Sequence, residues 1–126
     1  MKLQQWIKQN QLGLLFQQGS FGLEKESQRI DENGNIVTTP HPAVFGNRAY
    51  HPYIQTDFAE SQLELITPPN GKLEDSLRWL SAIHEVVLRS LPEQEYIFPF
   101  SMPAGLPPES AIQEAQLDNI EDVKYR

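Results

Sequence analysis

The sequence predicts an α+β fold in which an antiparallel sheet is flanked by helices. Two patterns lead to this prediction. Apolar residues recur at helical spacing over 73–91, and two runs suited to strands cover 20–30 and 53–66. The predicted order of elements is one helix, three strands and two helices. Because the strands follow one another along the chain, antiparallel pairing is the expected arrangement.

The first three elements are expected to lead into the sheet. Residues 2–17 have roughly helical spacing of apolar side chains and predict an amphipathic helix. Residues 20–30 predict a strand, and the turn sequence DENG at 31–34 places a glycine where a positive φ is needed. A short strand over 35–38 follows, so these segments predict a β-hairpin.

The remaining segments predict a loop, a strand and two helices. Residues 39–52 contain three prolines and are expected to be irregular, whereas 53–66 predict a second long strand. Residues 73–91 are expected to form a helix, and the five prolines of 92–108 predict a mostly extended or looped segment. Residues 109–122 predict a last, acidic helix. The apolar stripe of the helix over 73–91 consists of Leu77, Leu80, Ile83, Val87 and Leu91.

The composition is that of one small globular domain and excludes several kinds of site. The chain has 126 residues, and its formal net charge of −7 disfavours binding to a phosphate backbone, so no nucleic-acid partner is expected. Cysteine is absent, which excludes disulfides and thiolate metal ligands and fits a reducing cytoplasm. No apolar run approaches the roughly 20 residues of a membrane span, so a cytoplasmic protein without a membrane partner is expected.

Acidic residues on the two predicted strands are the main candidates for chemistry. Glu24 and Glu26 are two residues apart, so a strand would direct both side chains to one face. Asp57, Glu60 and Glu64 lie on the second predicted strand. If the two strands are neighbours, four or five carboxylates would converge on a small area. Like charges at that spacing repel unless cations or hydrogen bonds offset the repulsion.

Two interpretations of these carboxylates follow from the residues alone. Oxygen ligands suit a hard cation such as Mg²⁺, which often shares them with substrate phosphates, so a nucleotide site is possible. The simpler interpretation is a sheet with one solvated face. Asp57 and Glu64 are seven residues apart, and strict alternation would place them on opposite faces. A bulge or a strand end would be needed to bring them together.

Other polar residues indicate no site of their own. His41 and His51 each precede a proline in the predicted loop, and no second His or Cys stands at metal-ligand spacing, so structural roles are expected. Arg48 near His51 is expected to be a solvated side chain. Neither a phosphate-binding P-loop nor a dinucleotide-binding glycine motif is present. If ATP binds, a different kind of fold has to hold it.

Four sequence motifs resemble the glutamate–cysteine ligase family. They are FGLEKESQRI at 21–30, HPYIQTDFAESQLELITP at 51–68, FPFSMP at 98–103 and the closing YR. Their order and spacing are similar to those of the bacterial enzymes, in particular the ligase module of bifunctional glutathione synthetases. The resemblance implies a fold like the catalytic domain of glutamine synthetase. It also implies ATP- and Mg²⁺-dependent joining of the γ-carboxyl of L-glutamate to the amine of L-cysteine through γ-glutamyl phosphate.

The resemblance assigns expected roles to single residues. Glu24 and Glu26 match two strand glutamates that the family uses as Mg²⁺ ligands, and Asp57 and Glu64 match further acidic residues of the metal and substrate site. Tyr125 matches a tyrosine of the cysteine pocket. Mn²⁺ could replace Mg²⁺, and ATP is a co-substrate. No residue is assigned as a catalytic acid, base or nucleophile, and Glu60 receives no role.

The family's ligase module is several times longer than 126 residues, which leads to further expectations. Residues 1–126 are expected to be the N-terminal portion of a ligase catalytic domain and to have no activity alone. Exposed strand edges predict a homo-oligomer. Two alternatives remain: a non-catalytic binding or assembly module, and a related carboxylate–amine ligase with another amine acceptor.

Overall fold

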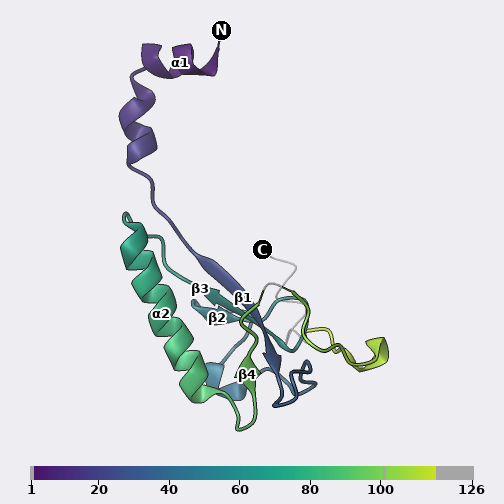
Figure 1. Ribbon diagram of the computed structural model, residues 1–126. Coiled ribbons are helices and arrows are strands. Elements are labelled where there is room, and N and C mark those ends of the chain that lie inside the picture. The colour runs from purple at the N-terminus through teal and green to yellow at the C-terminus, as the bar shows by residue number, and fades with distance from the viewer. Residues whose placement is uncertain (1, 101, 116–126) are drawn as a thin grey trace.

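The computed structural model describes residues 2–100 and 102–115, apart from the side chain of Gln17, and shows the predicted α+β fold (Figure 1). Four strands form one antiparallel sheet in the order β2-β3-β1-β4. The strands are β1 (Glu24–Ile30), β2 (Ile54–Gln55), β3 (Gln62–Ile66) and β4 (Tyr96–Ile97). The helices are α1 (Leu3–Gln9) and α2 (Leu73–Ser90), with three 3₁₀ turns at η1 (Leu12–Gln17), η2 (Ala43–Phe45) and η3 (Glu109–Ala111).

The core lies between the sheet and α2, which runs along one face of it (Figure 1). Leu63 and Leu65 of β3 are fully buried against Ile83 and Val87 of α2. The predicted stripe of α2 is therefore confirmed in its centre, whereas Leu77 near its start is half exposed. No helix of the described residues is both long and apolar enough to cross a membrane.

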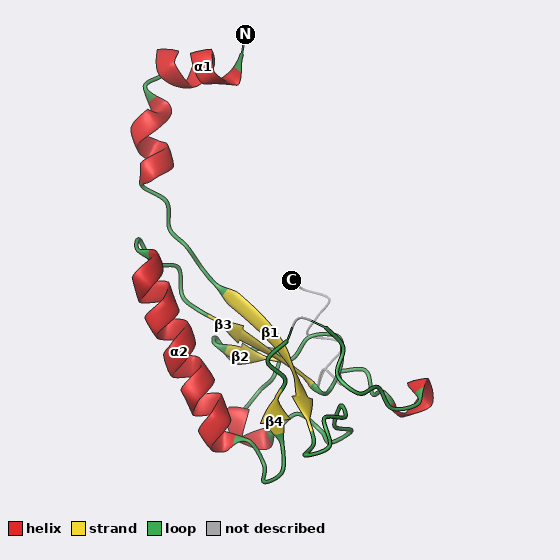
Figure 2. Ribbon diagram, viewed as in Figure 1, coloured by secondary structure: helices red, strands yellow, loops and turns green. Residues whose placement is uncertain are grey.

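The predicted helix over 2–17 is wrong as one element. It divides into α1 and η1 because Gln11 adopts a left-handed conformation with φ 53°, which interrupts the helical hydrogen bonds. Short helices are marginal unless an apolar face is packed. Figure 2 shows that α1 and η1 extend away from the sheet, and Leu14, Leu15 and Phe16 of η1 are exposed.

The single strand predicted over 53–66 is also wrong, because this segment is a hairpin. β2 pairs with β3 through Ile54 opposite Leu65 and Gln55 opposite Glu64. The hydroxyl of Thr56 stabilises the connecting loop, since it contacts the carbonyl oxygens of Ala59 at 3.1 Å and Gln62 at 2.9 Å. The side chain of Thr56 thus supplies turn contacts where neither glycine nor proline marks the turn.

Two shorter predictions are only partly met. Over 35–38 the expected strand is reduced to isolated bridges, one of which joins Ile36 to Ile30, after a turn in which Gly34 has a φ of 80°. Of the helix predicted over 109–122, the described residues form the short turn η3 and continue without helix to residue 115. Residues 116–122 of that prediction lie outside the described part.

Arg29 connects β1 to three other segments from a fully buried position. Its guanidinium donates to the carboxylate of Glu95 at 2.6 Å and to the hydroxyl of Thr39 at 2.9 Å. Further bonds reach the carbonyl oxygens of Thr39, Pro40 and Glu60 at 2.8–3.0 Å. A buried charge is tolerated only when it is paired and hydrogen-bonded, and the two terminal nitrogens of Arg29 meet that condition, whereas its Nε has no partner in the described part of the chain.

A second buried ion pair lies beside the first. Arg48 contacts the carboxylate of Glu60, which also accepts the backbone N–H of His41. The prediction that Arg48 is solvated is therefore wrong. His41 packs edge-on against Phe45, and neither of its ring nitrogens has a hydrogen-bond partner in the described part of the chain. Burial and the charges of Arg48 and Arg29 lower the pKa of His41 to about 4.

Replacing Arg29 by methionine should lower the free energy of unfolding by about 3–5 kcal/mol, because the carboxylate of Glu95 would stay buried without its partner. The matched control is Arg78→Met, which removes an exposed ion pair with Asp75 in α2 and should cost less than about 1 kcal/mol. Urea unfolding followed by circular dichroism measures both. Equal losses for the two variants would contradict the role of Arg29.

The lowered pKa of His41 predicts a loss of stability in mild acid. Between pH 6.5 and about 4, the unfolded chain binds a proton at His41 that the folded chain does not, so the free energy of unfolding falls as the pH falls. The contribution is about 3 kcal/mol over this range. In His41→Gln, unfolding curves measured at a series of pH values should show a shallower dependence. An unchanged dependence would show that another group causes the loss.

Candidate metal-binding site

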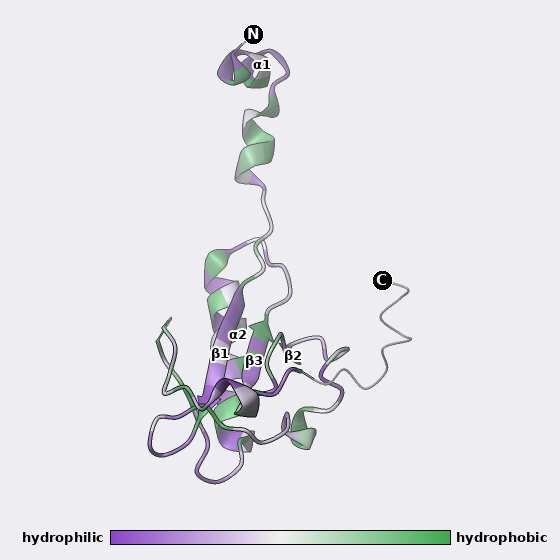
Figure 3. Ribbon diagram, turned by 90° about the vertical axis from the view of Figure 1, so that its right-hand side faces the viewer, coloured by the Kyte–Doolittle hydropathy of each residue, from purple (hydrophilic) through white to green (hydrophobic). Residues whose placement is uncertain are grey.

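The register of β1 and β3 places three glutamates on the face of the sheet opposite the core. Glu26 pairs directly with Glu64, and Glu24 pairs with Ile66. The alternate positions, including Leu63 and Leu65, face α2. Figure 3 shows β1 as a hydrophilic strand in front of α2, in keeping with its sequence EKESQRI. Strand alternation and this register therefore bring together the three glutamates that the sequence predicts to bind metal.

Glu26 and Glu64 occupy the closer of the two kinds of antiparallel pair. The carbonyl oxygen of Gln28 accepts the N–H of Phe98 at 2.9 Å, on the edge of β1 that faces away from β3. Glu26 is two residues earlier, so its backbone groups point to the same edge and form no ladder bonds with Glu64. Side chains of such non-hydrogen-bonded pairs lie closer together than those of hydrogen-bonded pairs.

Asp57 joins these glutamates because the chain turns between β2 and β3. It lies in the hairpin loop rather than in a strand, so the alternation rule that separated it from Glu64 does not apply. The side-chain nitrogen of Gln62 lies 2.9 Å from a carboxylate oxygen of Glu26 and 3.5 Å from one of Asp57. The two carboxylates therefore share one amide.

The electrostatics of Glu64 show that the other three carboxylates act on it. Partial burial raises the pKa of Glu64, and the negative charges of Glu24, Asp57 and Glu26 raise it further. These are the four residues expected to bind metal. A cation bound at this face would offset the repulsion between the carboxylates, because a positive charge there favours the ionised form of each one.

The donor set fits a hard divalent cation in its chemistry, although the side chains do not yet converge. All four groups are carboxylates, the ligand type that Mg²⁺ and Mn²⁺ prefer. Within the described residues, no three acidic or histidine side chains are close enough to hold a metal ion as they stand.

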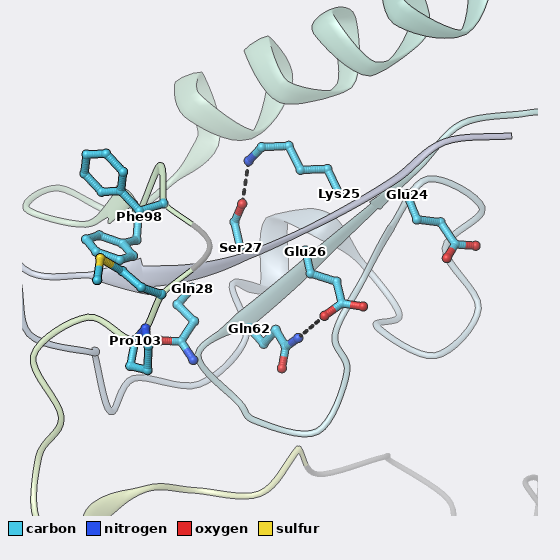
Figure 4. Close-up of a pocket in the computed structure, with 10 residues that line it drawn as sticks. Glu24, Lys25, Glu26, Ser27, Gln28, Gln62, Phe98 and Pro103 are labelled. Carbon is cyan, nitrogen blue, oxygen red and sulfur yellow. Dashed lines mark hydrogen bonds between the residues drawn. The ribbon is translucent and has the colours of Figure 1, made fainter. Parts of the chain in front are cut away.

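A pocket of about 610 Å³ lies along the acidic end of β1. Figure 4 shows Glu24, Glu26 and Gln62 on one side of the strand and Lys25 and Ser27 on the other. The ammonium group of Lys25 donates to the hydroxyl of Ser27 at 2.5 Å. β4 pairs with β1 only at Arg29 and Ile30, so the edge of β1 before that point borders the pocket. The opposite wall is formed by Phe98, Phe100, Met102 and Pro103.

Sequence reasoning missed Gln62 and this apolar wall. Gln62 is neutral, and the strand pattern gives it no signal that separates it from an ordinary solvated side chain. The motif FPFSMP supplies the wall, but the resemblance attached no role to it. β4 immediately precedes the motif and pairs with β1, and the N–H of Phe98 binds Gln28. This pairing could not be derived from the local pattern of 98–103.

Glu60 and His51 have contacts within the fold and do not belong to the acidic face. The carboxylate of Glu60 points into the protein against Arg48 and so does not belong to the acidic face. His51 has the structural role that was expected, because its Nδ1 accepts the backbone N–H groups of Tyr53 and Ile54 at 3.2 and 2.9 Å. Tyr125, expected in the cysteine pocket, lies outside the described residues.

Comparison with known proteins identifies close relatives. The chain is 79% identical over its full length to the glutathione biosynthesis bifunctional protein GshAB of Pasteurella multocida (strain Pm70), and 70% identical to that of Mannheimia succiniciproducens. In both cases the chain spans 17% of the relative's length.

Solved structures show the same fold. The crystal structure of a bifunctional glutathione synthetase from Pasteurella multocida matches 98% of this chain and 16% of that one, with a TM-score of 0.82 and 79% identity. Glutamate–cysteine ligase from Francisella tularensis, solved in complex with AMP, matches 76% of this chain and 19% of that one, with a TM-score of 0.73 and 32% identity. The family model for glutamate-cysteine ligase matches residues 4–126, and the chain belongs to this family.

Proposed function

We propose that the protein containing this chain is a glutamate–cysteine ligase. It joins the γ-carboxyl of L-glutamate to the amine of L-cysteine at the expense of ATP, which is the first step of glutathione biosynthesis. The observation that carries this proposal is the acidic face formed by Glu24, Glu26 and Glu64 of β1 and β3 together with Asp57 of the hairpin loop. It lies within a segment that the family model matches from residue 4 to 126. The chain contributes one wall of the active site.

Glu24, Glu26, Asp57 and Glu64 are the residues that would hold Mg²⁺, or Mn²⁺ in its place. Such a cation, when bound, would supply positive charge that neutralises the triphosphate and polarises the γ-phosphoryl group, so that an anionic nucleophile could approach. Tyr125 would line the cysteine pocket. These roles come from family resemblance, and the register of β1 and β3 and the shared field at Glu64 support the metal assignment.

The reaction then proceeds in two displacements. A γ-carboxylate oxygen of glutamate attacks the γ-phosphorus of ATP, the bond to the bridging oxygen breaks, and ADP leaves. The cysteine amine next attacks the acyl carbon of γ-glutamyl phosphate, loses a proton and expels inorganic phosphate. The role of this chain's carboxylates would be to hold the cation at a fixed position on the sheet. This form of catalysis depends on positioning and electrostatics more than on an acid–base pair.

Three further features belong to the same proposal. A cytoplasmic location fits the absence of cysteine. A homo-oligomer would use strand edges, such as the edge of β1 before Gln28, which β4 leaves unpaired. A related ligase with another amine acceptor is the alternative enzyme, and comparing cysteine with other amines as substrates of the full-length protein distinguishes the two.

Replacing Glu26 by glutamine in the full-length protein should weaken divalent-cation binding by about tenfold or more, because a charged oxygen ligand is lost from the centre of the face. Glu85→Gln in α2 is the matched control, since Glu85 is exposed and, among the described residues, pairs with Arg89 of the same helix. Mn²⁺ titration followed by electron paramagnetic resonance measures both affinities. Equal affinities for wild type and Glu26→Gln would rule out Glu26 as a ligand.

The 126-residue chain alone should form no γ-glutamylcysteine. It spans 17% of the length of its relatives, and the described residues supply one acidic wall and one apolar wall of an open pocket. The purified chain is incubated with ATP, Mg²⁺, glutamate and cysteine, and the product is measured by mass spectrometry. The full-length protein under the same conditions is the positive control. Product formed by the short chain would refute this prediction.

A further inference from the structure

Gln62 stands between two of the four carboxylates, Glu26 and Asp57. Its side-chain nitrogen donates to the carboxylate of Glu26 at 2.9 Å and lies 3.5 Å from the carboxylate of Asp57. Both neighbours are acceptors, so the amide must present its nitrogen rather than its oxygen toward them. One amide nitrogen carries two N–H groups, which is the number that two carboxylates require.

The backbone around Gln62 is held in place independently of this contact. Gln62 begins β3, its N–H donates to the carbonyl oxygen of Ala59 at 2.9 Å, and its own carbonyl oxygen lies 2.9 Å from the hydroxyl of Thr56. The cross-strand partner is Gln28 of β1. The amide therefore projects from a fixed point where the hairpin loop that carries Asp57 meets the strand that carries Glu64.

A neutral donor is well suited to this position. Hydrogen bonds to Glu26 and Asp57 offset part of their repulsion while no cation is bound. Within the described residues, none of the four carboxylates forms an ion pair with lysine or arginine. A positive side chain here would neutralise the face permanently, and a divalent cation would have to displace it. An amide arranges the carboxylates without that competition.

We propose that Gln62 is a positioning residue that holds Glu26 and Asp57 at a separation from which both can bind one divalent cation. It does not contact the cation itself and acts through the two carboxylates. This inference rests on the proposed metal site and adds to it a residue that the family resemblance did not assign. Groups that orient metal ligands in this way commonly change metal affinity by about 10–100-fold when they are removed.

The test uses Gln62→Met in the full-length protein, because methionine has nearly the same length and cannot donate a hydrogen bond. The dissociation constant for Mn²⁺, measured by electron paramagnetic resonance, should rise by about tenfold or more. The kcat at saturating Mg²⁺ should stay within about threefold of wild type, since a high cation concentration restores the bound state. Gln5→Met in α1, which replaces an exposed glutamine, is the matched control and should bind Mn²⁺ as wild type does.

Two further variants keep the test decisive. If Gln62→Met does not fold, Gln62→Asn replaces it, because the shorter amide cannot reach both carboxylates and should weaken Mn²⁺ binding likewise. Combining Gln62→Met with Asp57→Asn should cost less affinity than the sum of the single changes, since both remove the same contact. Additive losses would show that Gln62 does not act through Asp57, which overturns the inference.

The outcomes separate this inference from the proposed function. If Glu26→Gln weakens Mn²⁺ binding and the Gln62 variants do not, Gln62 is no positioning residue and the metal site stands. If none of these substitutions changes Mn²⁺ binding, the carboxylate face holds no cation and both proposals fail. Weakening by Glu26→Gln and the Gln62 variants, with Gln5→Met unchanged and the losses non-additive, supports both.

Discussion

The buried guanidinium of Arg29 is the interaction on which the arrangement of this chain depends. Its bonds join β1 to the loop at Thr39 and Pro40, to the end of the β2–β3 hairpin at Glu60, and to Glu95 just before β4. These segments are far apart in the sequence. One rigid, five-donor cation can satisfy partners on several sides, which a lysine could not do.

The acidic face follows from the same strand that Arg29 anchors. The side chain of Arg29 is on the buried side of β1, and the alternation of the strand directs Glu24 and Glu26 to the opposite side. Glu64 is brought opposite Glu26 by a register that simultaneously buries Leu63 and Leu65. The core and the candidate metal site thus lie on opposite faces of the paired strands β1 and β3, so a change in register would displace both.

Part of this arrangement could be predicted from the sequence and part could not. Alternation alone predicts that Glu24 and Glu26 share a face, and the spacing of apolar residues predicts α2. The position of Asp57 depends on a turn that Thr56 stabilises through its side chain, and no glycine or proline announces that turn. Similarly, the partners of Arg29 and Gln62 come from distant segments, so local patterns contain no information about them. Whole motifs indicate the family, whereas the contacts between these motifs are seen only in the structure.

The register of β1 and β3 also guards against misfolding. A slip of one residue would turn Glu64 toward α2 and expose Leu63 and Leu65 to water. Burying an unpaired carboxylate costs far more than a misplaced apolar residue, so the misaligned sheet is strongly disfavoured. The carboxylates that make this face suitable for a cation therefore also favour the native register of β1 and β3. Substitutions that neutralise them would loosen the specificity of folding before any ligand is present.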